Sequence, residues 1–142
     1  MTITEKNFLF HLGSIRKRAF AFLQKEMKAA GVTDLPPAHG DVLFTLWQRG
    51  SLSLKEVCEL SFRDKSTVSL IVNDAEKKGY VVKERDAQDG RGVKIRLTPR
   101  AEAKAVHMIK ISTHLREKFF TGMSEEEISI FFMLLNKISR NV

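Results

Sequence analysis

The chain has 142 residues, of which 43% are hydrophobic and 29% are charged, a balance that suits one folded domain (residues 1–142) and argues against disorder. No apolar run approaches the roughly 20 residues of a membrane-spanning helix, and the polar start lacks a secretion signal. A single cysteine excludes an internal disulfide bond. We therefore expect a cytoplasmic protein with no membrane partner. The net charge of +7 favours a polyanionic partner.

A long amphipathic helix is the first predicted element. Between residues 7 and 29, apolar side chains recur at steps of three and four, the spacing of one helical face. This face comprises Phe8, Leu12, Ile15, Ala19, Phe22, Leu23 and Met27. Because so wide an apolar stripe cannot remain alone in water, we expect it to pack against another helix.

Two shorter helices are predicted next. Pro36 and Pro37 are typical of a helix start and Gly50 of a helix end. The apolar stripe between them comprises Val42, Leu43, Leu46 and Trp47. Ser53-Leu54-Lys55-Glu56 is a capping box that opens the second helix. A tight turn over residues 61–63 follows it.

The fourth predicted helix spans residues 64–78 and ends at Gly79. One face is an apolar stripe of Val68, Ile71, Val72 and Ala75. The other face carries mostly short polar side chains, which can approach the edges of DNA bases closely: Lys65, Ser66, Ser69, Leu70 and Asn73. A helix, a turn and a polar helix in this order form a helix-turn-helix arrangement, and a helix of this width fits the major groove.

A basic β-hairpin is predicted after this helix, with strands over residues 80–85 and 93–98 and a tip between them. Val93, Ile95 and Leu97 alternate with Lys94 and Arg96, so one face should be buried and the other cationic. Residues 77–100 hold eight Lys or Arg and three Asp or Glu. Such a hairpin can reach phosphates or the minor groove of DNA.

Two further helices are predicted at the C-terminal end. Thr98 caps and Pro99 opens a long helix, and Ser124-Glu125-Glu126-Glu127 is a second capping box. The fold class is therefore mainly α with a small β-wing: a winged helix-turn-helix over residues 35–98, in three helices and a two-stranded wing, with N- and C-terminal dimerisation helices.

The end segments, residues 1–34 and 99–142, are more apolar than a small winged helix can cover. One explanation is that they pack on each other within one chain. The other is a homodimer, whose interface would include Phe8, Leu12, Leu115, Phe119, Ile128, Phe131, Phe132 and Leu135.

Three segments together resemble the winged-helix multiple-antibiotic-resistance regulators, the MarR family. They are Lys65-Ser66-Thr67-Val68-Ser69, Glu76-Lys77-Lys78-Gly79-Tyr80-Val81, and Asp89-Gly90-Arg91 leading into Ile95-Arg96-Leu97-Thr98-Pro99. The resemblance runs in register from about Leu35 to Pro99. It implies a homodimeric transcriptional regulator, a repressor released by a ligand, that binds a pseudo-palindromic operator in double-stranded DNA.

The predicted DNA contacts lie on the polar helix and on the hairpin. They are Lys65, Ser66, Thr67, Ser69, Asn73, Lys77, Arg85, Asp89, Arg91 and Lys94. By the resemblance, Arg91 enters the minor groove, where narrow A·T segments have enhanced negative potential. Asp89 would then either orient the Arg91 guanidinium or brace the loop.

The chain departs from the family at Leu70 and Asp74, where many members carry basic residues. Leu70 can contact a thymine methyl group, whereas Asp74 would repel phosphate if it faced the DNA backbone. A rival hypothesis follows, in which the winged helix is a protein-interaction module with weak or lost DNA binding.

Other kinds of site are weakly supported. Enzymatic motifs are absent and no cofactor is expected. His39 and His107 could hold zinc only with a second ligand three or four residues after His107, but Lys110 and Ile111 occupy those places. Cys58 reads as a small buried hydrophobe. The family binds phenolic or other aromatic anions between its dimer helices and its winged helix. Here the candidates for such a pocket are His11, Ile15, Arg18, Phe44 and Trp47.

Overall fold

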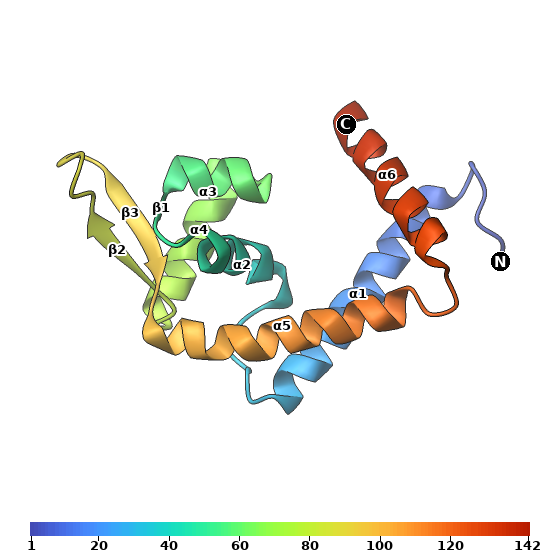
Figure 1. Cartoon of the computed structure of the whole chain (residues 1–142), viewed down its shortest axis with the longest axis horizontal. Coiled ribbons are helices and arrows are strands. Elements are labelled where there is room, and N and C mark those ends of the chain that lie inside the picture. The colour runs from blue at the N-terminus through green and yellow to red at the C-terminus, as the bar shows by residue number, and fades with distance from the viewer.

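Two long helices, α1 (Phe8–Ala29) and α5 (Pro99–Phe119), lie against each other and carry the winged helix at one end (Figure 1). The computed structural model describes all 142 residues. A last helix, α6 (Glu125–Asn141), rises from the far end of α5 on the side of the N-terminus. The predicted helical ends and their order along the chain are confirmed.

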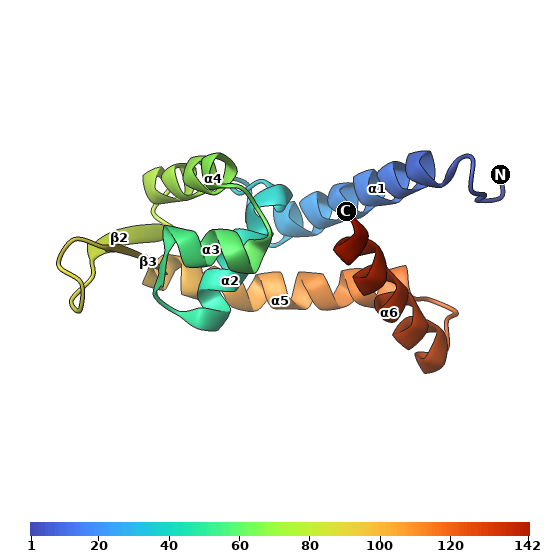
Figure 2. The ribbon, with the colours of Figure 1, turned by 90° about the horizontal axis from the view of Figure 1, so that it is seen from above.

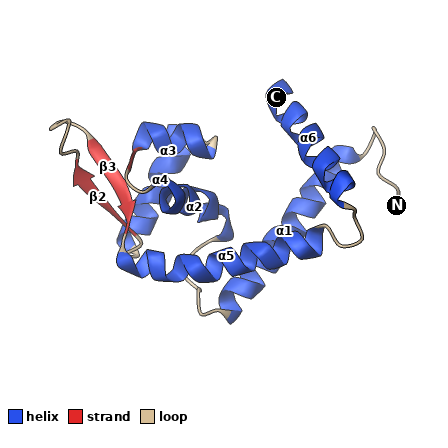
Figure 3. Cartoon of the chain, in the orientation of Figure 1, coloured by secondary structure: helices blue, strands red, loops and turns tan.

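The winged helix is built as the sequence predicts, with one addition. After a short 3-10 helix, η1 (Pro37–His39), come α2 (Gly40–Arg49), α3 (Leu54–Ser61), α4 (Lys65–Lys77), β2 (Val81–Arg85) and β3 (Val93–Leu97). The prediction of a two-stranded wing was wrong, because β1 (Leu52–Ser53) pairs antiparallel with β3. The sheet has the order β1-β3-β2 (Figure 3).

Helix starts follow the capping signals of the sequence. The Ser53 hydroxyl accepts from the Glu56 amide at 3.2 Å, and the Glu56 carboxylate accepts from the Ser53 amide at 2.7 Å. The same reciprocal pair forms between Ser124 and Glu127. At the start of α5, Thr98 accepts from the Ala101 amide. These bonds satisfy amide donors that a helix start otherwise leaves without partners.

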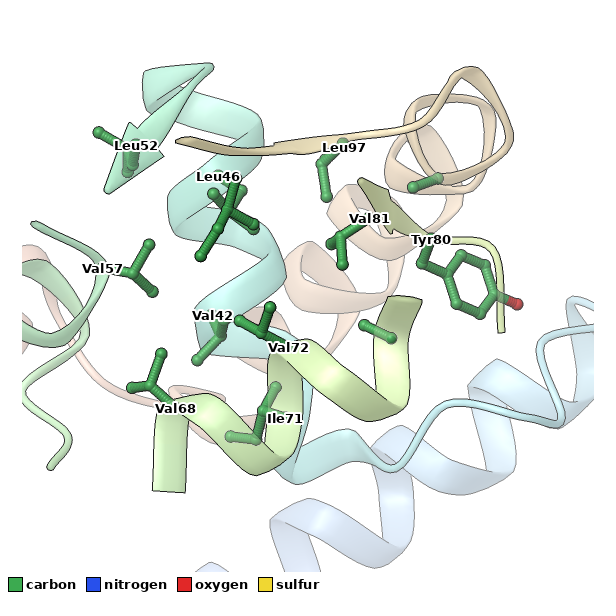
Figure 4. Packing of buried hydrophobic residues seen from close by; sticks show 13 residues of the cluster. Val42, Leu46, Leu52, Val57, Val68, Ile71, Val72, Tyr80, Val81 and Leu97 are labelled. Carbon is green, nitrogen blue, oxygen red and sulfur yellow. The ribbon is translucent and has the colours of Figure 1, made fainter. Parts of the chain in front are cut away.

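The core of the winged helix lies between α2, α3, α4 and the sheet. Its members include Val42, Leu46, Val57, Val68, Ile71, Val72, Tyr80, Val81, Ile95 and Leu97 (Figure 4). The predicted stripe of α4 is therefore buried. One prediction for the wing was wrong: Val93 is 51% exposed. It lies where β3 leaves the tip, beyond the part of the sheet that the helices cover.

The two end segments pack on each other only in part. Met27, Val32 and Ile111 form a second buried cluster where α1 crosses α5, and Ile128 is buried within the single chain. Rings of Phe119, Phe120, Phe131 and Phe132 contact one another at 5.3–6.3 Å between centroids. Large apolar side chains nevertheless remain exposed on α1 and α6: Phe8, Leu9, Phe10, Leu12, Ile130, Phe132, Met133, Leu134, Leu135 and Ile138. No helix combines the length and apolarity needed to cross a membrane.

Candidate nucleic-acid interface

The outward face of α4 gathers the side chains expected to contact DNA. Lys65, Ser66, Asn73 and Lys77 are exposed, and Ser69 and Thr67 are half-buried. The opposite face of α4 is the buried stripe. In Figure 2 no other element covers the outer side of α4. The helix is thus fixed to the core on one side and open on the other.

Asp64 organises the start of α4. Its carboxylate accepts from the Ser66 hydroxyl at 2.7 Å, and from the amide and hydroxyl of Thr67 at 2.8 Å each. These hydrogen bonds, the one from Ser66 first, lower the pKa of Asp64 to about 2. Because both hydroxyls give their protons to Asp64, their lone pairs stay available to accept from base amino groups. Sequence reasoning missed Asp64, although an aspartate before a helix is a typical N-cap.

Asn73 is tied to the wing. The Lys83 ammonium on β2 donates to the Asn73 side-chain oxygen at 2.6 Å and lies 3.5 Å from the Glu76 carboxylate. The amide nitrogen of Asn73 remains free to donate to a base or a phosphate. Lys83 was not among the predicted contacts. It lies ten residues after Asn73 in the sequence, and only the packing of β2 against α4 brings the two side chains together.

The tip of the wing is an ordered turn. The Asp89 carboxylate accepts from the Arg91 amide at 3.2 Å, and the Asp89 carbonyl accepts from the Gly92 amide at 2.9 Å. Asp86 closes the loop, because its amide donates to the Gly92 carbonyl at 2.8 Å. Of the two roles considered for Asp89, the structure shows bracing of the loop. The Arg91 side chain is exposed and makes no ion pair.

The cations of the interface fall into two groups. Arg96 is paired with Glu84 at 2.6 Å, which holds the pKa of Glu84 below its usual value. Lys94 is paired with Glu56 of the α3 capping box at 3.2 Å, so it faces α3 and not open solvent. Four other predicted contacts carry no intramolecular side-chain partner: Lys65, Lys77, Arg85 and Arg91.

Asp74 is turned away from the outward face of α4. Its carboxylate lies 2.8 Å from the Lys78 ammonium and 3.6 Å from the His39 ring nitrogen. Burial lowers the pKa of His39 despite the nearby carboxylate. Lys78 therefore offsets the charge of Asp74 where the two side chains meet.

The five predicted pocket residues do not share one pocket in the single chain. Phe44 and Trp47 stack at 5.9 Å and line an apolar pocket between α2 and α5. Ile15 and Arg18 line a separate hollow between α1 and the end of α5, with Lys118. His11 lines neither. Sequence reasoning missed the other walls of the first pocket, among them Leu43, Tyr80, Leu97, Lys104 and Met108.

Tyr80 links this pocket to the end of α4. Its hydroxyl donates to Asp34, and the Arg100 guanidinium lies 4.7 Å from its ring centroid. Arg100 in turn donates to the carbonyl of Lys78 at 2.6 Å. Burial, and then the hydrogen bond to Asp34, raise the pKa of Tyr80 to about 12. Tyr80 and Arg100 therefore connect the wall of the pocket to the C-terminal end of α4.

No three His, Cys, Asp or Glu side chains come together as a metal site requires. Cys58 is half-buried and packs against the core of the winged helix.

Comparison with known proteins supplies the family. The MarR family model matches residues 33–92. The regulator SarZ of Staphylococcus aureus is 33% identical over 101 residues, which are 70% of this chain and 67% of SarZ. An uncharacterized helix-turn-helix regulator of Bacillus subtilis, YwaE, is 29% identical over 102 residues, 71% of this chain but only 59% of YwaE.

Solved structures agree with the fold over nearly the whole chain. The Staphylococcus aureus MepR–DNA complex superposes with a TM-score of 0.83 at 22% identity, covering 99% of this chain and 100% of MepR. BpsR of Bordetella bronchiseptica gives 0.81 at 24% identity, covering 98% of both chains. At such low sequence identities, the structural similarity shows the fold alone. The sequence relationship to the family is shown by the match to the family model and by the similarity to SarZ. The chain belongs to the MarR family of winged helix-turn-helix transcriptional regulators.

Proposed function

We propose that this chain acts in the cytoplasm as a homodimeric, sequence-specific double-stranded DNA-binding regulator, a repressor that a small ligand releases from its operator. The outward face of α4, with Lys65, Lys77, Arg85 and Arg91 unpaired around it, carries the proposal. Unpaired cations lose no intramolecular partner when they meet phosphate, so their full charge is available to DNA. MepR, which has the same fold, was solved as a complex with DNA.

The dimer is proposed from what the single chain leaves exposed. In Figure 1, α6 projects from the rest of the chain, and about half of the surface of its apolar side chains Ile130, Phe132, Met133, Leu134, Leu135 and Ile138 remains exposed. An apolar surface of this extent marks an interaction site. We assign dimerisation to residues 1–34 and 99–142 and DNA binding to residues 35–98. A two-fold dimer would set two α4 helices about one DNA turn apart, to match a pseudo-palindromic operator.

The ligand is proposed to be a small aromatic anion. Lys104 is the one charged residue of the pocket beside Phe44 and Trp47, and the remaining walls are almost all apolar. One cation within aromatic and aliphatic walls suits a planar carboxylate. The DNA binding of BpsR is regulated by 6-hydroxynicotinic acid, a molecule of this chemistry. A ligand that favours another spacing of the two α4 helices would lower DNA affinity by its preference for that state.

Selection of bound duplexes from a random DNA pool tests the DNA-binding proposal. The wild-type chain should enrich a pseudo-palindrome, and the double variant Ser66→Glu with Ser69→Glu should lose affinity for it through repulsion. Gln24→Glu with Gln48→Glu is the matched control, since it adds the same charge at exposed positions of α1 and α2. Retained affinity in the folded serine variant would remove α4 from the interface.

Fluorescence tests the ligand proposal, because Trp47 is the single tryptophan of the chain and lines the pocket. Titration with 6-hydroxynicotinate or benzoate should change the emission and weaken binding to the selected duplex. Lys104→Met should abolish both responses, while Lys118→Met, at the separate hollow, should keep them. If neither acid changes emission or DNA binding, the ligand proposal fails and the DNA-binding proposal is unaffected.

A further inference from the structure

Leu70 is the one large apolar residue of α4 that is not buried. Its side chain is 72% exposed, whereas Val68, Ile71 and Val72 lie in the core. Single exposed leucines are common on proteins and need no explanation by themselves. This one has an unusual place, because it lies in the middle of the outward face of the recognition helix.

The neighbours of Leu70 are polar and held in place. Ser66, Leu70, Asn73 and Lys77 follow one another at helical steps of four, three and four, so they share a face. Ser66 is fixed by its bond to Asp64, and Asn73 by its bond from Lys83. Leu70 thus stands between two restrained polar groups. A basic or polar residue at this position could contact phosphates or base edges, whereas Leu70 presents a branched apolar end.

The major groove of DNA offers one apolar group, the C5-methyl of thymine. We infer that Leu70 reads thymine in each operator half-site through contact with this methyl group. The inference rests on the proposed binding of α4 in the major groove. It adds a base preference at one position, and it accounts for an apolar side chain on a face that is otherwise polar.

The size of the effect follows from the methyl group. Removing one buried methyl from the contact should weaken binding about fourfold per half-site, or about fifteenfold when both half-sites are changed. Leu70→Ala should remove the same discrimination without unfolding the chain, because the side chain is exposed and alanine favours helix.

The experiment uses the duplex selected by the wild-type chain, prepared with deoxyuridine in place of thymidine at one symmetric pair of positions, one in each half-site, at a time. Deoxyuridine keeps the base pair and lacks only the methyl group. For wild type, one symmetric pair of substitutions should weaken binding about fifteenfold. Leu70→Ala should bind the thymidine duplex and the deoxyuridine duplex equally. Leu70→Met, which keeps an apolar end, should still prefer the thymidine duplex. Phe62→Ala, which truncates another exposed apolar residue outside α4, should retain the full preference.

Two results would overturn the inference while leaving DNA binding intact. One is a selected site in which no deoxyuridine substitution matters, or whose half-sites lack thymine. The other is a methyl preference that persists unchanged in Leu70→Ala. Failure of the wild-type chain to enrich any DNA would instead overturn the proposed function, and this inference with it.

Discussion

Replacing Arg91 by alanine should weaken DNA binding without disturbing the wing. The Arg91 guanidinium has no partner in the free protein, and the loop around it is held by hydrogen bonds from the Arg91 and Gly92 amides to the carboxylate and the carbonyl of Asp89. Arg96→Ala is the matched control, since the Arg96 guanidinium on the same wing is already engaged by Glu84 at 2.6 Å. Both variants lose one positive charge per chain. The difference between them therefore measures contact with DNA rather than net charge.

The expected magnitude follows from the count of unpaired cations. Each cation that replaces a condensed counterion contributes about 0.9 to the slope of log affinity against log salt, so losing Arg91 from both wings of a dimer should reduce the slope by about 1.8. Loss of the contact should cost about 1–3 kcal/mol of binding free energy, and more on A·T-rich flanks, where the minor groove is narrow. Asp89→Ala should cost less and leave the slope nearly unchanged, because Asp89 braces the loop.

Fluorescence anisotropy with the selected duplex, measured between about 50 and 200 mM salt, gives both quantities in one series. An Arg91→Ala slope equal to that of wild type would refute the reasoning, since the wing would then carry no contact. Equal losses in Arg91→Ala and Arg96→Ala would show that net charge, and not a located contact, explains the effect.

Three further predictions concern the dimer, a titration and a helix cap. Phe132→Asp should dissociate the dimer in sedimentation experiments, because burying an unpaired carboxylate costs several kcal/mol, whereas Phe62→Asp should leave it intact. Tyr80 is the single tyrosine, so absorbance should report a pKa of about 12. The raised pKa stabilises the fold fully below pH 10, and about 2–3 kcal/mol should be lost between pH 10 and 12; Tyr80→Phe should lack this loss in denaturant titrations. Ser124→Ala should lower stability by about 1 kcal/mol, and an unchanged thermal midpoint would count against the cap.

Local signals predicted much of the fold. The buried stripe of α4 and both capping boxes depend on residues within one or two helical turns of each other, so periodicity and spacing encode them. The position of the wing tip between the two strands also followed from its sequence, whereas its hydrogen-bonded turn and the role of Asp89 were shown only by the structure.

Features that depend on distant pairing were not predicted. The strand β1 has only two residues and exists because Leu52 lies opposite Ile95, more than forty positions later. The orientation of Asp74 depends on His39 and Lys78, and no pattern within α4 shows where the start of α2 will lie.

The pocket shows the same limit for function. Phe44 and Trp47 were expected to meet His11, Ile15 and Arg18 of α1, yet in the single chain α5 supplies most of the facing wall, including Lys104, and α1 contributes Met27 instead. The resemblance to the MarR family had predicted that these aromatic residues share one pocket with His11, Ile15 and Arg18. The crossing of α1 over α5 instead keeps Ile15 and Arg18 at another hollow.

The salt dependence of binding between the wild-type chain and its selected duplex tests the central claim most directly. Four unpaired cations, Lys65, Lys77, Arg85 and Arg91, in each chain give eight in a dimer, so log affinity should fall with log salt at a slope of up to about 7. A scrambled duplex should bind more weakly at every salt concentration. Binding that does not respond to salt, or that does not distinguish the two duplexes, would contradict the account and favour a winged helix that serves as a protein-interaction module.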